Sequence, residues 1–266
     1  MGEELAEKRR DFQFRAATRW LKAAGGGLLD ALLPPHCLVC GDDVSKPASL
    51  CVSCWQNLRL LDDPVCDRLG IPFPYDPGEG IVSVEALAHP PVWDRARAAV
   101  IFDDVSKEIV HAFKYGDRSD AGLFMMRHME RVGTRLMAGA DLVVPVPLYW
   151  TRLWQRRFNQ AAFLAQNLAK RGGKPYMPRV LKRIRRTSSQ VGLDAKARHK
   201  NMRRAFAVSD ELAGKAVLLI DDVRTTGATL SACATALKKA GASRVDVLTF
   251  ALVKEPHRPH IAKHDA

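Results

Sequence analysis

No stretch of this 266-residue chain approaches the roughly 20 consecutive apolar residues that a membrane-spanning helix needs, so the sequence predicts no membrane span. The N-terminus, residues 2–10, is first acidic and then basic with no apolar core behind it, which is not the pattern of a secretory signal. We therefore expect a cytoplasmic protein with reduced thiols. The length suits one ordinary domain with a smaller appendage, and an apolar share of 47% can fill a core.

Acidic residues are almost missing from one segment. Residues 150–204 hold sixteen Lys or Arg and a single acid, Asp194, so this segment carries about +15 whereas the whole chain carries +12. Such a concentrated positive field attracts polyanions, either nucleic acid or ligands that carry pyrophosphate. The alternative is a solvated basic face without a specific partner.

Cysteine is also scarce, but four of the six cysteines form two C-x2-C pairs: Cys37 with Cys40, and Cys51 with Cys54. Each pair can present two thiolates to one ion, and two pairs complete a tetrahedron. This pattern predicts a closed structural zinc site without a catalytic water, against the alternative of four buried structural thiols. Cys66 begins half of a further knuckle in which Leu69 stands at the second cysteine position, so it is left out of the metal set. Cys233 is expected in the core.

A buried apolar run at residues 217–220 leads into two adjacent acids, Asp221 and Asp222. This run reads as a central strand covered on both faces, and a Thr/Gly loop over 225–229 follows it. Apolar residues then recur at helical spacing up to Gly241, and residues 245–253 return as a second strand. The pattern predicts a βαβ unit with a right-handed crossover.

The loop at 225–229 is suited to a phosphate. Backbone N–H groups point out of the helix N-terminus, Gly227 lets the backbone approach closely, and three threonines add hydroxyl donors. Acids do not favour a phosphate, so the pair before the loop indicates vicinal hydroxyls, a divalent cation or both. A ribose 5-phosphate moiety meets all these demands. The alternative is an ordinary strand–turn–helix with a capping Thr.

Four parts of the chain can be distinguished. We expect a helical segment over 1–33, a cysteine module and linker over 34–92 with a short strand at 81–87, an α/β domain over 93–254, and a flexible tail over 255–266. In the α/β domain, strands are expected over 96–102 and 141–146, and helices over 106–115, 121–137 and 159–170. The strand at 141–146 ends in Pro-Val-Pro, so the next loop should lie at the carboxyl edge, where open α/β sheets bind ligands.

The segment 217–229 resembles the phosphoribosyl pyrophosphate (PRPP) motif of type I phosphoribosyltransferases. The resemblance implies that Asp221 and Asp222 hold the ribose hydroxyls, and that the 5-phosphate lies on a loop made of Thr225, Thr226, Gly227, Ala228 and Thr229. It also implies a pyrophosphate loop with Arg152, Arg156 and Arg157 as donors. A flexible hood over 185–204 would close over PRPP, with Arg186 and Arg198 among its working residues.

An ordered series of blocks over residues 30–253 is similar to the ComF family. The blocks are the paired cysteines, residues 94–99, 111–118, 144–148, 157–161, 186–193 and 198–206, and the PRPP loop. This resemblance implies a type I phosphoribosyltransferase-like α/β fold, a parallel sheet flanked by helices, with a small N-terminal zinc module of four cysteines. It implies structural Zn²⁺, and Mg²⁺ with PRPP. Two positions depart from the family pattern. Arg157 stands where the family commonly has glycine, and Leu69 stands where a third knuckle, seen in some members, has its second cysteine.

Two kinds of function follow from this resemblance. Family members are linked to natural competence, where they assist uptake of single-stranded DNA, which implies PRPP, single-stranded DNA and a DNA-uptake helicase or other competence proteins as partners. Aromatics at 149, 150, 154 and 158 among arginines suit base stacking, although they also suit helix packing. The alternative is a Mg-dependent phosphoribosyltransferase, which works by positioning and needs few acid–base groups. No base-recognition pocket is visible in the sequence.

Overall fold

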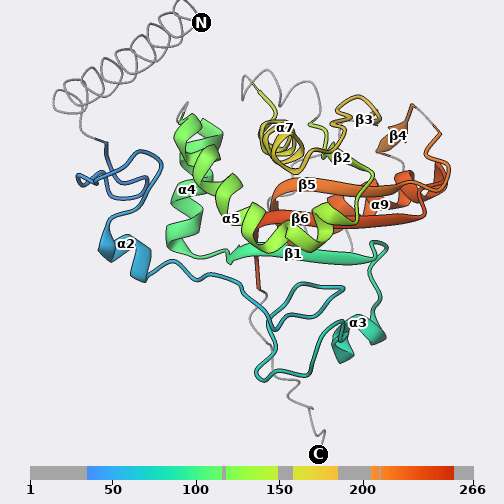
Figure 1. Ribbon diagram of the computed structural model, residues 1–266, viewed down its shortest axis with the longest axis horizontal. Coiled ribbons are helices and arrows are strands. Elements are labelled where there is room, and N and C mark those ends of the chain that lie inside the picture. Colours follow the sequence, from blue (N-terminus) through green and yellow to red (C-terminus); the bar gives the residue numbers. More distant parts are fainter. Residues whose placement is uncertain (1–34, 116–117, 149–157, 185–204, 210, 255–266) are drawn as a thin grey trace, which may run out of the picture.

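The computed structural model describes residues 35–115, 118–148, 158–184, 205–209 and 211–254, which are arranged around a central sheet (Figure 1). The helical segment expected over 1–33 and the tail expected over 255–266 lie outside these ranges. Within them, no helix combines the length and the apolar character needed to cross a membrane.

Four parallel strands form the sheet in the order β1-β6-β5-β2. They are β1 (Arg95–Ile101), β2 (Leu142–Pro145), β5 (Ala216–Arg224) and β6 (Arg244–Leu252). The central pair, β5 and β6, is buried along most of its length, as expected of strands covered on both faces. The four strands predicted for the α/β domain are confirmed, although β5 continues past its two acids.

Helices cover both faces of this sheet. Helices α5 (Ser119–Ala138) and α7 (Gln160–Gly172) pack on one face with α4 (Asp104–Tyr115) beside α5, and α9 (Ala228–Lys239) packs on the other. Because side chains alternate along a strand, Leu218 and Ile220 of β5 join the core under α5 and α7, whereas Val217 and Leu219 join the core under α9. The predicted helices over 106–115, 121–137 and 159–170 are confirmed.

Helix α7 begins and ends on local signals. The Asn159 side chain accepts a hydrogen bond from Ala162 N–H, and Gly173 closes the helix in the left-handed conformation. The Asn159 amide also donates to the Val146 carbonyl at 3.1 Å, which ties the start of α7 to the end of β2. The first residues of α7 therefore face the carboxyl edge of the sheet.

A small antiparallel sheet lies beside the α9 core. It pairs β3 (Leu181–Arg183) with β4 (Phe206–Val208), and its residues Leu181 and Phe206 are buried there. The sequence did not predict these strands, because each is only three residues long. They position Arg183 at the edge of the main sheet.

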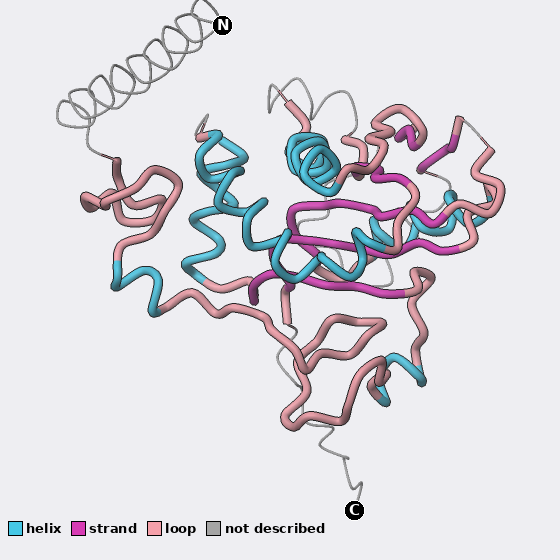
Figure 2. Tube along the Cα trace, viewed as in Figure 1, coloured by secondary structure: helices cyan, strands magenta, loops and turns pink. Residues whose placement is uncertain are grey.

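The cysteine module is mostly loop (Figure 2), with two short helices, α2 (Val52–Gln56) and α3 (Val84–Ala88). The chain after α2 runs along β1, where Leu61 N–H donates to Ala99 O and Ile101 N–H to Arg59 O, so this edge of the sheet is covered. The strand predicted over 81–87 is wrong. Residues 84–88 are helical because the Ser83 side chain caps the turn by accepting from Ala86 N–H.

Candidate functional site

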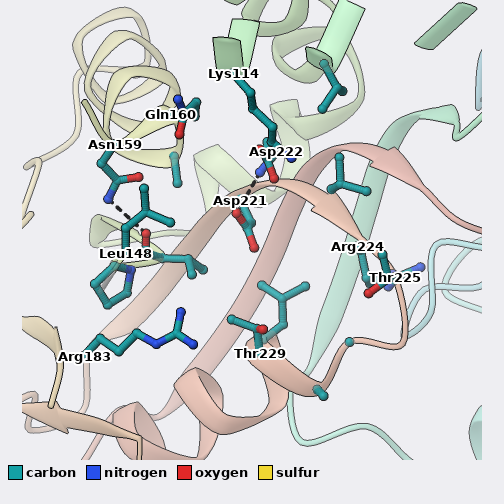
Figure 3. Close-up of a pocket in the computed structure, with 18 of the residues that line it drawn as sticks. Lys114, Leu148, Asn159, Gln160, Arg183, Asp221, Asp222, Arg224, Thr225 and Thr229 are labelled. Carbon is teal, nitrogen blue, oxygen red and sulfur yellow. Dashed lines mark hydrogen bonds and ion pairs between the residues drawn. The ribbon is translucent and has the colours of Figure 1, made fainter. Parts of the chain in front are cut away.

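A pocket of about 290 Å³ opens at the carboxyl ends of β2 and β5 (Figure 3). One wall is formed by the end of β5 and the loop that follows it, and the other by the β2 loop with the start of α7. Its polar lining comes from four separate segments of the chain: Lys114, Asn159, Gln160, Arg183, Asp221, Asp222, Arg224, Thr225 and Thr229. The place is the one expected for ligands of an open parallel sheet.

The two adjacent acids point to different sides of β5. Asp221 follows the side of Leu219, toward α9, and Asp222 follows the side of Ile220, toward α4. Asp221 is partly exposed, and its Oδ1 accepts the backbone N–H of Asp222 at 2.9 Å. The pair thus offers two carboxylates to one pocket from opposite faces of a single strand.

Asp222 forms an ion pair inside the pocket. Lys114 Nζ, from the last turn of α4, lies 2.8 Å from Asp222 Oδ2. Both side chains are mostly buried, at 18% and 12% exposed, so solvent screens the pair only weakly. Removing one partner of a buried pair costs about 3–5 kcal/mol, because the other charge is left uncompensated.

The loop after β5 turns at Gly227. This residue has φ 74° and ψ 3°, in the left-handed region, and α9 begins directly after it. A Cβ at this position would lie 2.7 Å from Cη2 of Trp93. Thr225, Gly227, Ala228 and Thr229 line the pocket, but Thr226 is not among its described lining residues. The Thr226 hydroxyl is buried and has no hydrogen-bond partner within the described part of the chain.

Trp93 and Arg224 support this loop through contacts with its residues and with the turn that begins at Cys66. The Trp93 indole N–H donates to the Arg68 carbonyl at 2.8 Å, and the Arg224 guanidinium stands 5.8 Å from the Trp93 ring and donates to the Leu69 carbonyl. Burial lowers the pKa of Arg224 to about 10, so it stays protonated at neutral pH. Both anchors bind carbonyls of the turn that begins at Cys66.

The opposite wall contributes Arg183, which points into the pocket from β3 (Figure 3). Its guanidinium also lies 5.6 Å from the centre of the Phe206 ring on the neighbouring strand. Arg183 and Lys114 therefore bring positive charge toward the two acids. The basic residues predicted for this site, Arg152, Arg156, Arg157, Arg186 and Arg198, lie outside the described residues.

Sequence reasoning had not assigned Lys114, Arg183, Arg224 or Trp93 to the site. Lys114 lies in the block 111–118, but nothing in its spacing shows that the last turn of α4 reaches β5. In the sequence, Arg183 is only one of the sixteen basic residues of segment 150–204. Arg224 and Trp93 gain their positions from contacts between distant segments. Only the three-dimensional fold identifies these four residues.

The four paired cysteines come together in one cluster. The sulfurs of Cys37, Cys40, Cys51 and Cys54 all lie within 4.8 Å of one another. A zinc tetrahedron with bonds of about 2.3 Å would draw them to about 3.8 Å. The Cys51 N–H donates to the Cys37 sulfur at 3.3 Å, as in a metal knuckle. The donor set, four thiols without an oxygen or a free position, fits structural zinc.

The sulfurs of the cluster affect one another's protonation. Burial would raise the pKa of the Cys37 thiol, but backbone N–H groups of Cys40, Cys51 and Val39 lower it to about 6. The pKa of Cys54 is raised to about 11 by burial, by hydrogen bonds with Cys51 and Cys37 and by the charge of Cys37. A bound cation removes this competition because it stabilises all four thiolates at once.

Cys66 forms a turn of similar shape outside this cluster. Its buried sulfur accepts the N–H groups of Leu69 at 3.4 Å and Ser83 at 3.2 Å, and Gly70 closes the turn in the left-handed region. Cys233, by contrast, is fully buried in the α9 core, as predicted, and burial raises its pKa. Neither thiol belongs to the metal-binding cluster found among the described residues.

The parallel sheet, the acid pair with its glycine turn at the carboxyl edge, and the four-cysteine cluster define a class: a type I phosphoribosyltransferase-like α/β protein with an N-terminal zinc module. Comparison with protein families agrees. Residues 28–84 match the double zinc ribbon domain, and residues 159–265 match the phosphoribosyl transferase domain.

Similar proteins identify the family. The chain is 31% identical over 216 residues to "DNA utilization protein YhgH" of Salmonella typhimurium, covering 79% of this chain and 87% of the relative. It is 29% identical to "Competence protein F" of Haemophilus influenzae, over 74% of this chain and 88% of that protein. "Competence protein ComFC" of Bacillus subtilis is 26% identical, over 87% of this chain and 98% of that protein. This chain belongs to the ComF family.

Proposed function

We propose that this protein binds PRPP in the pocket at the carboxyl end of β5 and assists the uptake of single-stranded DNA in natural transformation. One observation carries the PRPP half of the proposal. Asp221, Asp222 and the loop that turns at Gly227 line the same cavity. Carboxylates for ribose hydroxyls and helix N-terminal N–H groups for a phosphate are thereby combined in one place.

Each part of the pocket has a role in this proposal. The 5-phosphate lies on the N–H groups of the loop and the hydroxyls of Thr225 and Thr229, with the α9 dipole favouring its charge. Asp221 accepts hydrogen bonds from the ribose hydroxyls. Lys114 and Arg183 bring positive charge to the phosphorylated ligand from the α4 and β3 sides. The arginines of segments 149–157 and 185–204 add to this field.

We propose that Mg²⁺ binds in the pocket together with PRPP. The pocket has two carboxylates, oxygen donors of the kind that Mg²⁺ prefers, and Mg²⁺ is commonly held by one or two carboxylates plus phosphate oxygens. When bound, the ion would neutralise part of the pyrophosphate charge. Asp221 would be its nearer ligand, since Asp222 is engaged with Lys114.

Isothermal titration with Mg-PRPP tests the binding proposal. We expect wild-type protein to bind one PRPP per chain, and Thr229→Val, which has nearly the same volume but no hydroxyl, to bind it roughly tenfold more weakly. Thr134→Val on α5 is the matched control, because its hydroxyl bonds only to carbonyls within its own helix. Absence of PRPP binding by the wild type would contradict the proposal.

The DNA half of the proposal is supported by the names of the relatives, which refer to competence and to DNA utilization. The charge of about +15 over residues 150–204 suits a phosphate backbone. A cytoplasmic location, in which the zinc module binds a DNA-uptake helicase or another competence protein, completes this proposal.

The salt dependence of oligothymidine binding tests the DNA contact. Fluorescence anisotropy should show affinity falling steeply with salt, and the triple variant Arg152→Gln/Arg156→Gln/Arg157→Gln should have a log–log slope shallower by about 2, at about 0.7 per lost contact. The matched control removes three exposed lysines elsewhere, Lys107, Lys215 and Lys239, and should leave the slope unchanged. Equal slopes in the two triple variants would contradict DNA binding by residues 150–204.

The second candidate function is catalysis: a Mg-dependent phosphoribosyltransferase that transfers ribose 5-phosphate from PRPP to an acceptor. The retained acid pair, open to a cavity rather than filled by core side chains, favours it. Arg186 from the hood and the two acids would be its working residues. Release of pyrophosphate from PRPP in the presence of candidate acceptors, lost in Asp221→Asn, would support it. Stoichiometric PRPP binding without release of pyrophosphate would indicate that PRPP is a regulatory ligand of this protein.

A further inference from the structure

Lys114 is fixed where it meets the pocket. It lies in the last turn of α4, whose residues Ile109, Val110 and Phe113 are buried in the main core, so the helix is held firmly against the sheet. From there its Nζ reaches 2.8 Å from Asp222 Oδ2 (Figure 3). The ion pair therefore joins the last turn of α4 to the end of β5 in the lining of the cavity.

This lysine changes what the acid pair can hold. An ammonium at 2.8 Å already compensates the charge of Asp222, so a divalent cation gains little there unless it displaces a mostly buried partner. Asp221, on the other side of the strand, is not part of this ion pair. The ammonium carries three donors, so the group that bonds to Asp222 can also bond to oxygens of a ligand.

We propose that Lys114 is a ligand-binding residue of this pocket and takes the place of a divalent cation at Asp222. It orients that carboxylate and donates to a hydroxyl or phosphate oxygen of a phosphorylated sugar. The identity of the ligand rests on the proposed function. Any Mg²⁺ that accompanies PRPP then lies on the ligand's own oxygens and at Asp221, not at Asp222.

Manganese binding to the ligand-free, zinc-loaded protein tests the cation replacement without PRPP. In electron paramagnetic resonance titrations, Lys114→Met should bind one Mn²⁺ at least tenfold more tightly than wild type does. The double variant Lys114→Met/Asp222→Asn should lose this gain in affinity. Lys107→Met, an exposed lysine of the same helix, is the matched control and should behave as wild type. If Lys114→Met does not fold, Lys114→Gln serves with the same expectation. No gain of Mn²⁺ in the folded variant would overturn the inference.

Binding of ribose 5-phosphate in magnesium-free buffer tests the ligand contact. Wild type should bind it with nearly the same Kd with and without Mg²⁺. Lys114→Met should bind at least tenfold more weakly without Mg²⁺ and regain affinity when Mg²⁺ is added, while Lys114→Arg keeps the charge and stays near wild type. Equal Kd values in wild type and Lys114→Met would overturn the contact. If wild type binds neither ribose 5-phosphate nor PRPP, the proposed function is contradicted instead. The Mn²⁺ titration would then still test whether Lys114 takes the place of a cation at Asp222.

Discussion

Single residues at the end of β5 show how strongly the pocket is constrained. Asp221 and Asp222 are neighbours in sequence, yet one faces α9 and the other is paired with Lys114. Gly227 is fixed by both its positive φ and the Trp93 ring below it. The sequence predicted the acid pair and the glycine turn because a strand, two acids and a Thr/Gly loop are local features. It could not predict Lys114, because the ion pair depends on how α4 packs against the sheet.

The glycine turn gives a prediction at this scale. Gly227→Ala should lose about 1–2 kcal/mol for a left-handed alanine and a further 1–3 kcal/mol for overpacking against Trp93. Gly173→Ala is the matched control, since Gly173 is also left-handed but a Cβ there meets nothing within 4 Å. Urea denaturation of both variants gives the difference in the free energy of unfolding. Equal losses would mean that the Trp93 ring does not restrict the loop.

At the scale of elements, the turn that begins at Cys66 supports the loop at residues 225–229. Trp93 and Arg224 hold carbonyls of Arg68 and Leu69, and Cys66 stabilises that turn by accepting two N–H groups. A segment that lacks a second cysteine thus keeps a structural role. The turn connects the cysteine module to the pocket, and within the described ranges Cys66 belongs to no group of three or more potential metal ligands.

Hydrogen exchange measures this support. Trp93→Phe keeps an aromatic ring but removes the indole N–H that donates to Arg68 O. We expect faster exchange of the backbone amides at 225–229, because the loop loses an anchor. Trp55→Phe is the control: Trp55 packs against Phe124 and His128 of α5, so the same change there should leave the loop amides unaffected. Unchanged exchange in Trp93→Phe would contradict the supporting role.

Elements differed in how well the sequence predicted them. Helices α4 and α5 could be predicted because their apolar periodicity extends over many residues, and the four sheet strands because each contains a run of apolar residues. The apolar residues of segment 81–87 predict a strand, but Val84 and Leu87 are largely exposed and the Ser83 cap makes residues 84–88 helical. Strands β3 and β4 are too short for periodicity, and they pair across a long connection.

At the scale of the whole molecule, the cysteine cluster and the sheet share one core. Leu38 and Leu58 are buried with residues of α4 and α5, and the Trp55 ring lies 6.4 Å from that of Phe124. The zinc module therefore contributes apolar surface to the α/β domain rather than extending from it. Loss of the metal should weaken both parts together.

Chelation tests this coupling. Removing zinc with a strong chelator should lower the melting temperature of the whole protein, because the unfolded module exposes core residues such as Leu38. Cys51→Ser should bind no zinc and melt at the same lowered temperature, whereas Cys66→Ser should keep one zinc per chain. Zinc release that leaves the melting temperature unchanged would show that the two parts are independent.

The central claim, that the pocket on β5 is a PRPP site, is tested most directly by the melting temperature with and without Mg-PRPP. At about 100 times its Kd, PRPP should add about 2.7 kcal/mol of stability, a rise of about 5–10 °C for a chain of this size. Asp221→Asn should lose most of that rise, while the exposed Glu108→Gln on α4 should keep it. A wild-type melting temperature that stays unchanged at millimolar Mg-PRPP would contradict the claim.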